Sequence, residues 1–145
     1  MIDNCLKESV QECSVDLRLN NIFKLKSIKE VDKNKLPDMK ELKLPYLIKP
    51  NEYLIGSTIE VMSNEKFAVL VFPKAYGIRI GLSIESGVLY PGFKAPVMFG
   101  IKNNSQNNIK LTKGVSLIQL CFLEIDSDFV KLAHKFQNGV FSKWQ

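Results

Sequence analysis

Short stretches in which apolar and polar residues alternate recur along this 145-residue chain and restrict the folds open to it. In SVDLRL, Val15, Leu17 and Leu19 share one face, while Asp16 and Arg18 point to the other. The same interpretation applies to YLIGSTIEVM, FAVLVF, VMFGIK, IKLT and VSLIQLCFLEI, each bounded by Gly, Pro, Asn or Lys. Several strands at short spacing with turn signals between them predict an all-β barrel or sandwich.

Helical patterns are few and short. PKAYGIRIG (73–81) is one helix candidate, and DSDFVKLAHKF (126–136) is a second because its apolar residues partly fit a helical stripe. The Asn-rich NNSQNN (103–108) lies between two strand-like segments and predicts a hairpin loop.

Length and composition indicate one globular domain. The hydrophobic fraction is 46%, and no apolar run approaches the roughly 20 residues that span a bilayer. The polar N-terminus MIDNCLKESVQEC does not fit a signal peptide, so we expect no membrane partner and a cytoplasmic location. Three cysteines without a CxxC pair favour a reduced compartment.

The sequence has too few potential zinc ligands in a suitable pattern, which excludes zinc chemistry. The chain has one histidine, His134, and lacks the H-x-E and P-C-x-x-C pattern of zinc nucleobase deaminases.

The net charge of +5 indicates an anionic partner only weakly. Many of the lysines lie in KLKSIKEVDKNKLPDMKELK (24–43), where acids alternate with bases as in a solvated connecting segment. A phosphate-bearing ligand or nucleic acid is the alternative explanation of this charge.

Six separated stretches, taken in order, resemble the superfamily of trimeric dUTPases and dCTP deaminases. They are ECSVDLRLNNIF, KPNEYLIGSTIEVM, PKAYGIRIGL, SGVLYPGFKAP, LTKGVSLIQLCFLEI and HKFQNGVFSKWQ. The opening strand and the KFQNG sequence are more similar to the deaminase branch than to the short dUTPases. The region 24–45 matches little of either, and its role is open.

The resemblance implies an all-β, distorted jelly roll or β-barrel of the dUTPase-like (β-clip) type, assembled as a homotrimer with pockets between subunits. Residues 1–134 then form one domain, and 135–145 form a C-terminal arm. The implied ligand is a pyrimidine deoxynucleoside triphosphate. Magnesium is bound through the phosphates of that ligand, and no metal site is expected in the protein itself.

Both catalytic acids of the family are missing. The Asp that activates water in dUTPases falls at Tyr90, and the acid that moves protons in the deaminases falls at Gly100. A phenol with a pKa near 10 is a poor base at neutral pH, and glycine has no titratable group. Glu85, before the Pro-Gly turn, and Glu60, at a strand end, are possible substitutes, although neither aligns with a family catalytic position.

The phosphate-binding motif is eroded as well. The family's Arg-Ser-Ser becomes Lys74, Ala75 and Tyr76, which removes two hydroxyl donors and the guanidinium fork. Arg79 and Gln119 match family phosphate-site residues, and a surface arginine and an outward strand residue are the competing interpretations.

Other binding features remain in the resemblance. Phe93 matches the aromatic residue on which deoxyribose stacks, with an ordinary core phenylalanine as the alternative. Asp16 matches the first-motif Asp, with a surface acid as its alternative. The remaining nucleotide contacts expected by position are the strand backbone at Val88 and Leu89 and, in the arm, Lys135 and Gln137.

These observations favour a member of pyrimidine deoxynucleotide metabolism that has lost its catalytic acids and binds a nucleotide or acts as a scaffold or regulator. One alternative is an active dUTP diphosphatase or dCTP deaminase with a relocated acid such as Glu85. The other is a nucleic-acid-binding β-barrel, the least favoured partner class because only the net charge supports it.

Overall fold

The structure, a computed structural model, describes residues 1–27 and 37–126. The expected arm at 135–145, the domain boundary at 134 and the helix candidate from 127 onward lie outside these residues. The described strands are β1 (Ile2–Asp3), β2 (Val15–Leu25), β3 (Met39–Leu42), β4 (Tyr46–Ile48), β5 (Tyr53–Ser63), β6 (Phe67–Pro73), β7 (Leu82–Glu85), β8 (Val88–Leu89), β9 (Lys94–Asn103), β10 (Ile109–Leu111) and β11 (Ser116–Glu124). The helical segments are the 3₁₀ turn η1 (Lys7–Ser9) and α1 (Ala75–Arg79).

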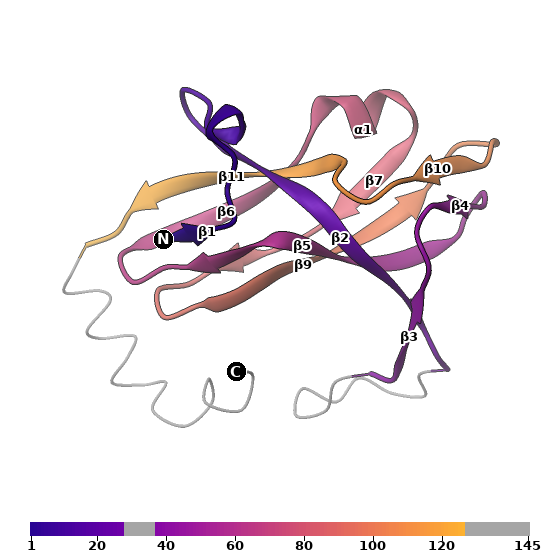
Figure 1. Cartoon of the computed structure of the whole chain (residues 1–145), viewed down its shortest axis with the longest axis horizontal. Helices are drawn as coiled ribbons and strands as arrows, with labels where there is room; N and C mark the ends of the chain where they lie inside the picture. Colours follow the sequence, from indigo (N-terminus) through magenta and orange to yellow (C-terminus); the bar gives the residue numbers. More distant parts are fainter. Residues whose placement is uncertain (28–36, 127–145) are drawn as a thin grey trace.

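One long, curled antiparallel sheet organises the described part of the chain. Its strands follow the order β7-β9-β5-β2-β11-β6-β8, with β1 added to β5 and β3 added to β2, while β10 and β4 form a separate pair. The first half of β2 pairs with β11 and the second half with β5. In Figure 1, β2 therefore crosses obliquely from the layer of β11 and β6 to the layer of β5 and β9. The predicted all-β, barrel-like fold is confirmed.

The alternation seen in the sequence decides which side chains form the core. Along β5 every second residue from Leu54 to Met62 is buried. Leu54 and Met62 are the large apolar side chains on this face, and burying one such side chain contributes ~1.5–3 kcal/mol. The core includes Leu17, Leu19, Ile22, Ile48, Leu54, Ile101, Leu111, Ile118 and Leu120.

Both ends of the charged stretch 24–43 include residues that belong to the sheet. Met39–Leu42 forms β3 and pairs with the end of β2, with Leu42 opposite Ile22 and Lys40 opposite Lys24. The interpretation as a connecting segment was wrong for Lys24, Leu25 and Met39–Leu42, because a few apolar residues suffice to extend an existing sheet edge. Residues 28–36 lie outside the described ranges.

The prediction of a hairpin loop at NNSQNN was wrong. The flanking strands do not pair with each other, because β10 pairs with β4. The loop is instead fixed by the fully buried Asn103, whose Nδ2 donates to the carbonyls of Ile48 (3.0 Å) and Asn107 (2.7 Å). Its Oδ1 accepts from the Ser105 N–H at 2.9 Å. The asparagines serve local hydrogen bonding, which pattern reading cannot distinguish from a hairpin turn.

The helix expected at 73–81 is confirmed as α1. The chain leaves it at Gly81, whose φ of +88° suits glycine, and an added Cβ there would lie 2.8 Å from the Cβ of Ser105. None of the helices in the described ranges is long and apolar enough to cross a membrane.

Candidate functional site

The stretch SGVLYPGFKAP (86–96) predicts a tight hairpin around Pro91-Gly92; the turn forms, but the prediction of a hairpin was wrong because the two flanking strands do not pair with each other. The Phe93 N–H donates to the Tyr90 carbonyl at 3.2 Å, and Gly92 has a φ of +95°, as the third position of a type II turn requires. The preceding β8 pairs with β6, whereas the following β9 pairs with β5 and β7. The turn is fastened to Asn64, whose carbonyl accepts from the Gly92 N–H and whose N–H donates to the Phe93 carbonyl.

The residues predicted around this turn have different surroundings. The Tyr90 side chain is 54% exposed, and Val88 is exposed on β8. Leu89 and Phe93 are half-buried and pack against the core. Phe93 therefore packs against the core, as its alternative interpretation expected, while part of its side chain stays exposed.

Gly100 lies under a tyrosine that sequence reasoning did not single out. A Cβ placed on Gly100 would meet the hydroxyl oxygen of Tyr53 at 2.3 Å and its Cζ at 2.9 Å. Tyr53 comes from β5, which pairs with β9 so that Ile55 is opposite Gly100. The Tyr53 side chain thus fills the space into which a side chain at position 100 would project. The one available signal was the glycine itself, because a strand-interior glycine often marks the close approach of another group.

Glu85 is brought to the same place by the pairing of β7 with β9, in which it stands directly opposite Gly100. Directly opposite residues of an antiparallel pair share a face, so Glu85 and Tyr53 flank Gly100 on one side of the sheet. Glu85 does not align in sequence with a family catalytic position, but the pairing places it beside Gly100 across the two strands. Burial raises the pKa of the Tyr53 phenol, and the negative charge of Glu85 raises it further, so the phenol stays protonated at neutral pH.

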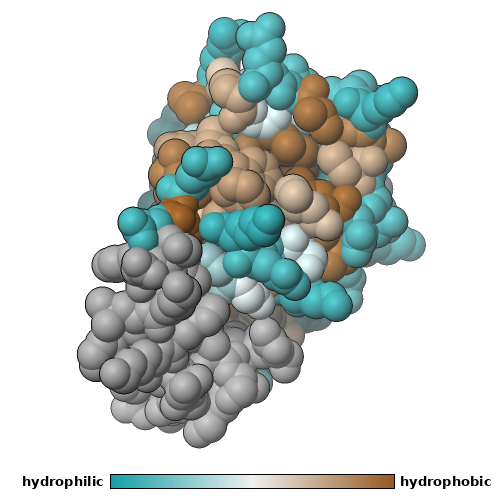
Figure 2. All heavy atoms as spheres, turned by 90° about the vertical axis from the view of Figure 1, so that its left-hand side faces the viewer, coloured by the Kyte–Doolittle hydropathy of each residue, from teal (hydrophilic) through white to brown (hydrophobic). Residues whose placement is uncertain are grey.

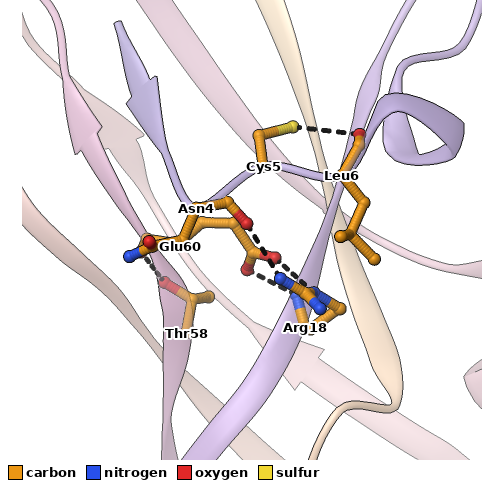
Figure 3. Close-up of polar contacts among 6 residues, drawn as sticks. All are labelled: Asn4, Cys5, Leu6, Arg18, Thr58 and Glu60. Atoms are coloured by element: carbon orange, nitrogen blue, oxygen red, sulfur yellow. Dashed lines mark hydrogen bonds and ion pairs between the residues drawn. The ribbon is translucent and has the colours of Figure 1, made fainter.

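Glu60 has a structural role that removes it from the candidate acids. It lies within β5, not at a strand end as expected, and its side chain is fully buried. One carboxylate oxygen accepts from the backbone N–H of Arg18 and the other from its Nε, both at 2.7 Å (Figure 3). The same guanidinium donates through Nη2 to the carbonyl of Asn4 at 2.8 Å, which ties the N-terminal segment to the sheet.

Cys5 lies beside this ion pair (Figure 3). Burial raises the pKa of its thiol, the charge of Glu60 adds to the rise and Arg18 opposes it. Cys5, Cys13 and Cys121 are all free thiols.

A second group of candidate residues forms a row on β2, β11 and the end of β6. Asp16 stands opposite Gln119, and Gln119 stands opposite Phe72, two residues before Lys74. The Lys74 ammonium lies 2.5 Å from Oδ2 of Asp16, and the two side chains are 27% and 14% exposed. Asp16 Oδ1 is buried and has no hydrogen-bond partner within the described part of the chain.

Both the oxygen and the nitrogen of the Gln119 side-chain amide form hydrogen bonds within the chain. Its Oε1 accepts from the Ser14 hydroxyl at 3.1 Å, and its Nε2 donates to the Pro73 carbonyl at 3.3 Å. Arg79 is exposed at the end of α1. Lys135 and Gln137 lie outside the described residues.

The strand order keeps the two groups on different parts of the sheet. Tyr53, Gly100 and Glu85 belong to β5, β9 and β7, whereas Asp16, Gln119 and Lys74 belong to or follow β2, β11 and β6. Among the described residues no cluster of three or more His, Cys, Asp or Glu side chains is suited to hold a metal ion.

Comparison with known proteins gives one consistent result. Residues 1–125 match the family model described as "dCTP deaminase-like". The dUMP-forming dCTP deaminase of Bifidobacterium adolescentis is 30% identical over 138 residues, covering 87% of this chain and 72% of that protein. The corresponding protein of Streptomyces coelicolor is 31% identical over 133 residues, covering 81% of this chain and 68% of that protein.

Solved structures agree on the fold. The 2'-deoxycytidine 5'-triphosphate deaminase of Agrobacterium tumefaciens superposes with a TM-score of 0.67 at 16% identity over 92% of this chain, although the chain spans only 47% of that protein. A dUTPase of Staphylococcus bacteriophage 80alpha, solved with dUpNHpp, gives a TM-score of 0.58 at 15% identity and covers 88% of this chain and 83% of that one.

Proposed function

This chain belongs to the dCTP deaminase-like family, and we propose that it is a member whose nucleotide site no longer deaminates or hydrolyses. It acts in pyrimidine deoxynucleotide metabolism as a nucleotide-binding, scaffolding or regulatory protein. The observation that carries this proposal is the Tyr53 hydroxyl over Gly100, because it fills the space that an acid at that position needs.

The other residues of the site also support the absence of catalysis. A positioned acid or base contributes about 10²–10⁴-fold to such reactions, and neither Gly100 nor the protonated Tyr53 can act as a base at neutral pH. Ala75 and Tyr76 lack the hydroxyls expected around the phosphates, so the positioning contribution falls as well.

The proposed ligand is a pyrimidine deoxynucleoside triphosphate held between copies of the chain. Lys74 and Arg79 supply the cations for its phosphates, and the β8 backbone with Phe93 supplies the surface for base and sugar. The separation of the two residue groups along one sheet supports a pocket that takes residues from two subunits.

Magnesium enters with the phosphates in this proposal, where it neutralises part of their charge. The orphan Oδ1 of Asp16 fits a contact to a hydrated, phosphate-bound ion, since this buried acceptor has no partner in the described residues.

A homotrimer is part of the same proposal. The outer face of β6, β8 and β11 carries exposed apolar side chains, with Phe72 43%, Val88 40% and Leu123 49% exposed. Apolar residues also gather on the end of the molecule that Figure 2 shows. An exposed apolar face of this kind supports burial between copies of the chain. Light scattering at micromolar concentration tests it, and a monomer would contradict the assembly.

The functional test is a turnover assay with dCTP and dUTP in the presence of magnesium, followed by chromatography of the products. We expect no uridine nucleotide from dCTP and no pyrophosphate from dUTP above a buffer control. Magnesium-dependent product formation that rises in proportion to the protein would overturn the proposal.

A second candidate, an active enzyme with a relocated acid, is favoured by one observation. Glu85 stands directly opposite Gly100 and is exposed, so its carboxylate can reach a ligand on that face. If turnover appears, Glu85→Gln should abolish it, whereas Glu124→Gln, which removes an exposed carboxylate at the end of β11, should leave it unchanged.

A further inference from the structure

We infer that Asp16 acts as an internal competitor that holds Lys74 away from metal-free anions and keeps the affinity of its phosphate site for them low. This inference rests on the proposed function, because it takes Lys74 as the phosphate contact. It concerns the strength of that contact and its control, not catalysis.

The geometry ties the ammonium to the carboxylate. Lys74 Nζ and Asp16 Oδ2 are 2.5 Å apart, although their residues are separated by 58 positions in the chain. Lys74 is also fixed at its backbone, since its N–H donates to the Leu117 carbonyl at 2.9 Å. Asp16 of β2 therefore holds the ammonium, while β11 fixes the backbone from which the side chain extends.

Burial makes this pairing effective. With 27% and 14% of the two side chains exposed, the charges interact more strongly than a surface pair would. A phosphate approaching Lys74 meets a site whose net charge is zero and must replace a carboxylate already in contact. The orphan Oδ1 adds repulsion, because no hydrogen bond within the described residues disperses its negative charge.

Among the described residues, the one directly opposite Asp16 does not offer it a second partner. Gln119, directly opposite, uses its amide on Ser14 and on the Pro73 carbonyl. Neutralising Asp16 should therefore leave a half-buried ammonium whose best available partner is an external anion. Asn is the matched substitution, because it keeps the shape and an acceptor oxygen while removing the charge.

The test measures binding of inorganic tripolyphosphate by calorimetry in EDTA, so that neither a base nor a metal contributes. We expect Asp16→Asn to bind it about tenfold more tightly than the unaltered protein, with a gain that shrinks as salt rises. Glu124→Gln removes the same charge five residues beyond Gln119 on β11 and should change the affinity less than twofold. Adding Lys74→Met to Asp16→Asn should abolish the gain.

Each other outcome overturns the inference. Equal or weaker binding by Asp16→Asn would mean that Asp16 does not oppose the anion, and a gain that survives Lys74→Met would place the anion elsewhere. Absence of binding by every variant would show that Lys74 is no anion site. Asp16→Ser provides a second neutral variant if thermal melts show that Asp16→Asn is not folded. None of these results depends on turnover of dCTP or dUTP. The role of Asp16 and the proposed loss of catalytic activity can therefore be disproved independently of each other.

Discussion

Adding a single methyl group at Gly100 should reveal whether Tyr53 closes the site. In Gly100→Ala the new Cβ would lie 2.3 Å from the Tyr53 hydroxyl oxygen, far inside the 3.4 Å at which ordinary contact begins. Overpacking of this kind costs ~1–3 kcal/mol. The lower part of that range applies, because the end of a side chain can move more easily than backbone.

The substitution also has an opposing effect. At a position with an ordinary φ, replacing Gly by Ala stabilises the folded protein by about 0.4–1 kcal/mol, because it reduces the conformational entropy of the unfolded chain. We therefore expect Gly100→Ala to lower the free energy of unfolding by ~0.5–2 kcal/mol. Gly87→Ala is the matched control, because no atom lies within 4 Å of a Cβ there and its φ is not positive, and it should be neutral or slightly stabilising.

The decisive measurement is a double-mutant cycle with Tyr53→Ala. Urea unfolding followed by circular dichroism at one fixed protein concentration gives the free energies, since an oligomer's stability depends on concentration. Once Tyr53 is truncated, Gly100→Ala should cost nothing, which gives a coupling energy of about 1 kcal/mol or more. If Gly100→Ala still lowered the free energy of unfolding in the Tyr53→Ala background, or if it were as stable as Gly87→Ala, Tyr53 would not be the group that fills the space at Gly100.

Three further changes test other parts of the structure. Glu60→Ala should destabilise the fold by ~3–5 kcal/mol, because it removes the carboxylate that accepts from the Arg18 backbone N–H and Nε and pairs with the guanidinium charge, and thermal or urea unfolding measures this. Gly81→Ala should cost ~1–3 kcal/mol, because it combines a φ of +88° with contacts to Ser105, and a neutral result in the same melts would contradict the turn geometry. Burial alone would raise the pKa of Glu52, but hydrogen bonds from neighbouring groups outweigh it and lower that pKa. This carboxylate therefore stabilises the fold above its unfolded pKa near 4.5, and the contribution disappears as pH falls through the lower folded value. Glu52→Gln should flatten the acid side of a stability-against-pH curve, and an unchanged slope would count against it.

Local features of the fold could be read from the sequence because they depend on near neighbours in the chain. Alternation identified 53–63 as a strand and, around Leu17, also the buried face, and Pro91-Gly92 marked a turn whose backbone requires glycine. The buried face of 53–63 was not evident in the sequence, because it carries Thr58 and Glu60 while Ile59 and Val61 are only half-buried. The helix at 73–81 followed from the same local reasoning. The order and spacing of the motifs predicted the family, which the match over 1–125 confirms.

The tertiary structure alone decided which strands meet, because pairing between distant segments depends on the geometry of the whole sheet. Composition could not distinguish a hairpin at NNSQNN from a loop fixed by one buried asparagine. No local pattern connects Glu85 with Gly100 or Asp16 with Lys74. The sequence by itself determined that Gly100 carries no acid. Only the packing of β5 against β9 determined that Tyr53 takes up its space, since a side chain's neighbours are set by register across strands and not by position along one.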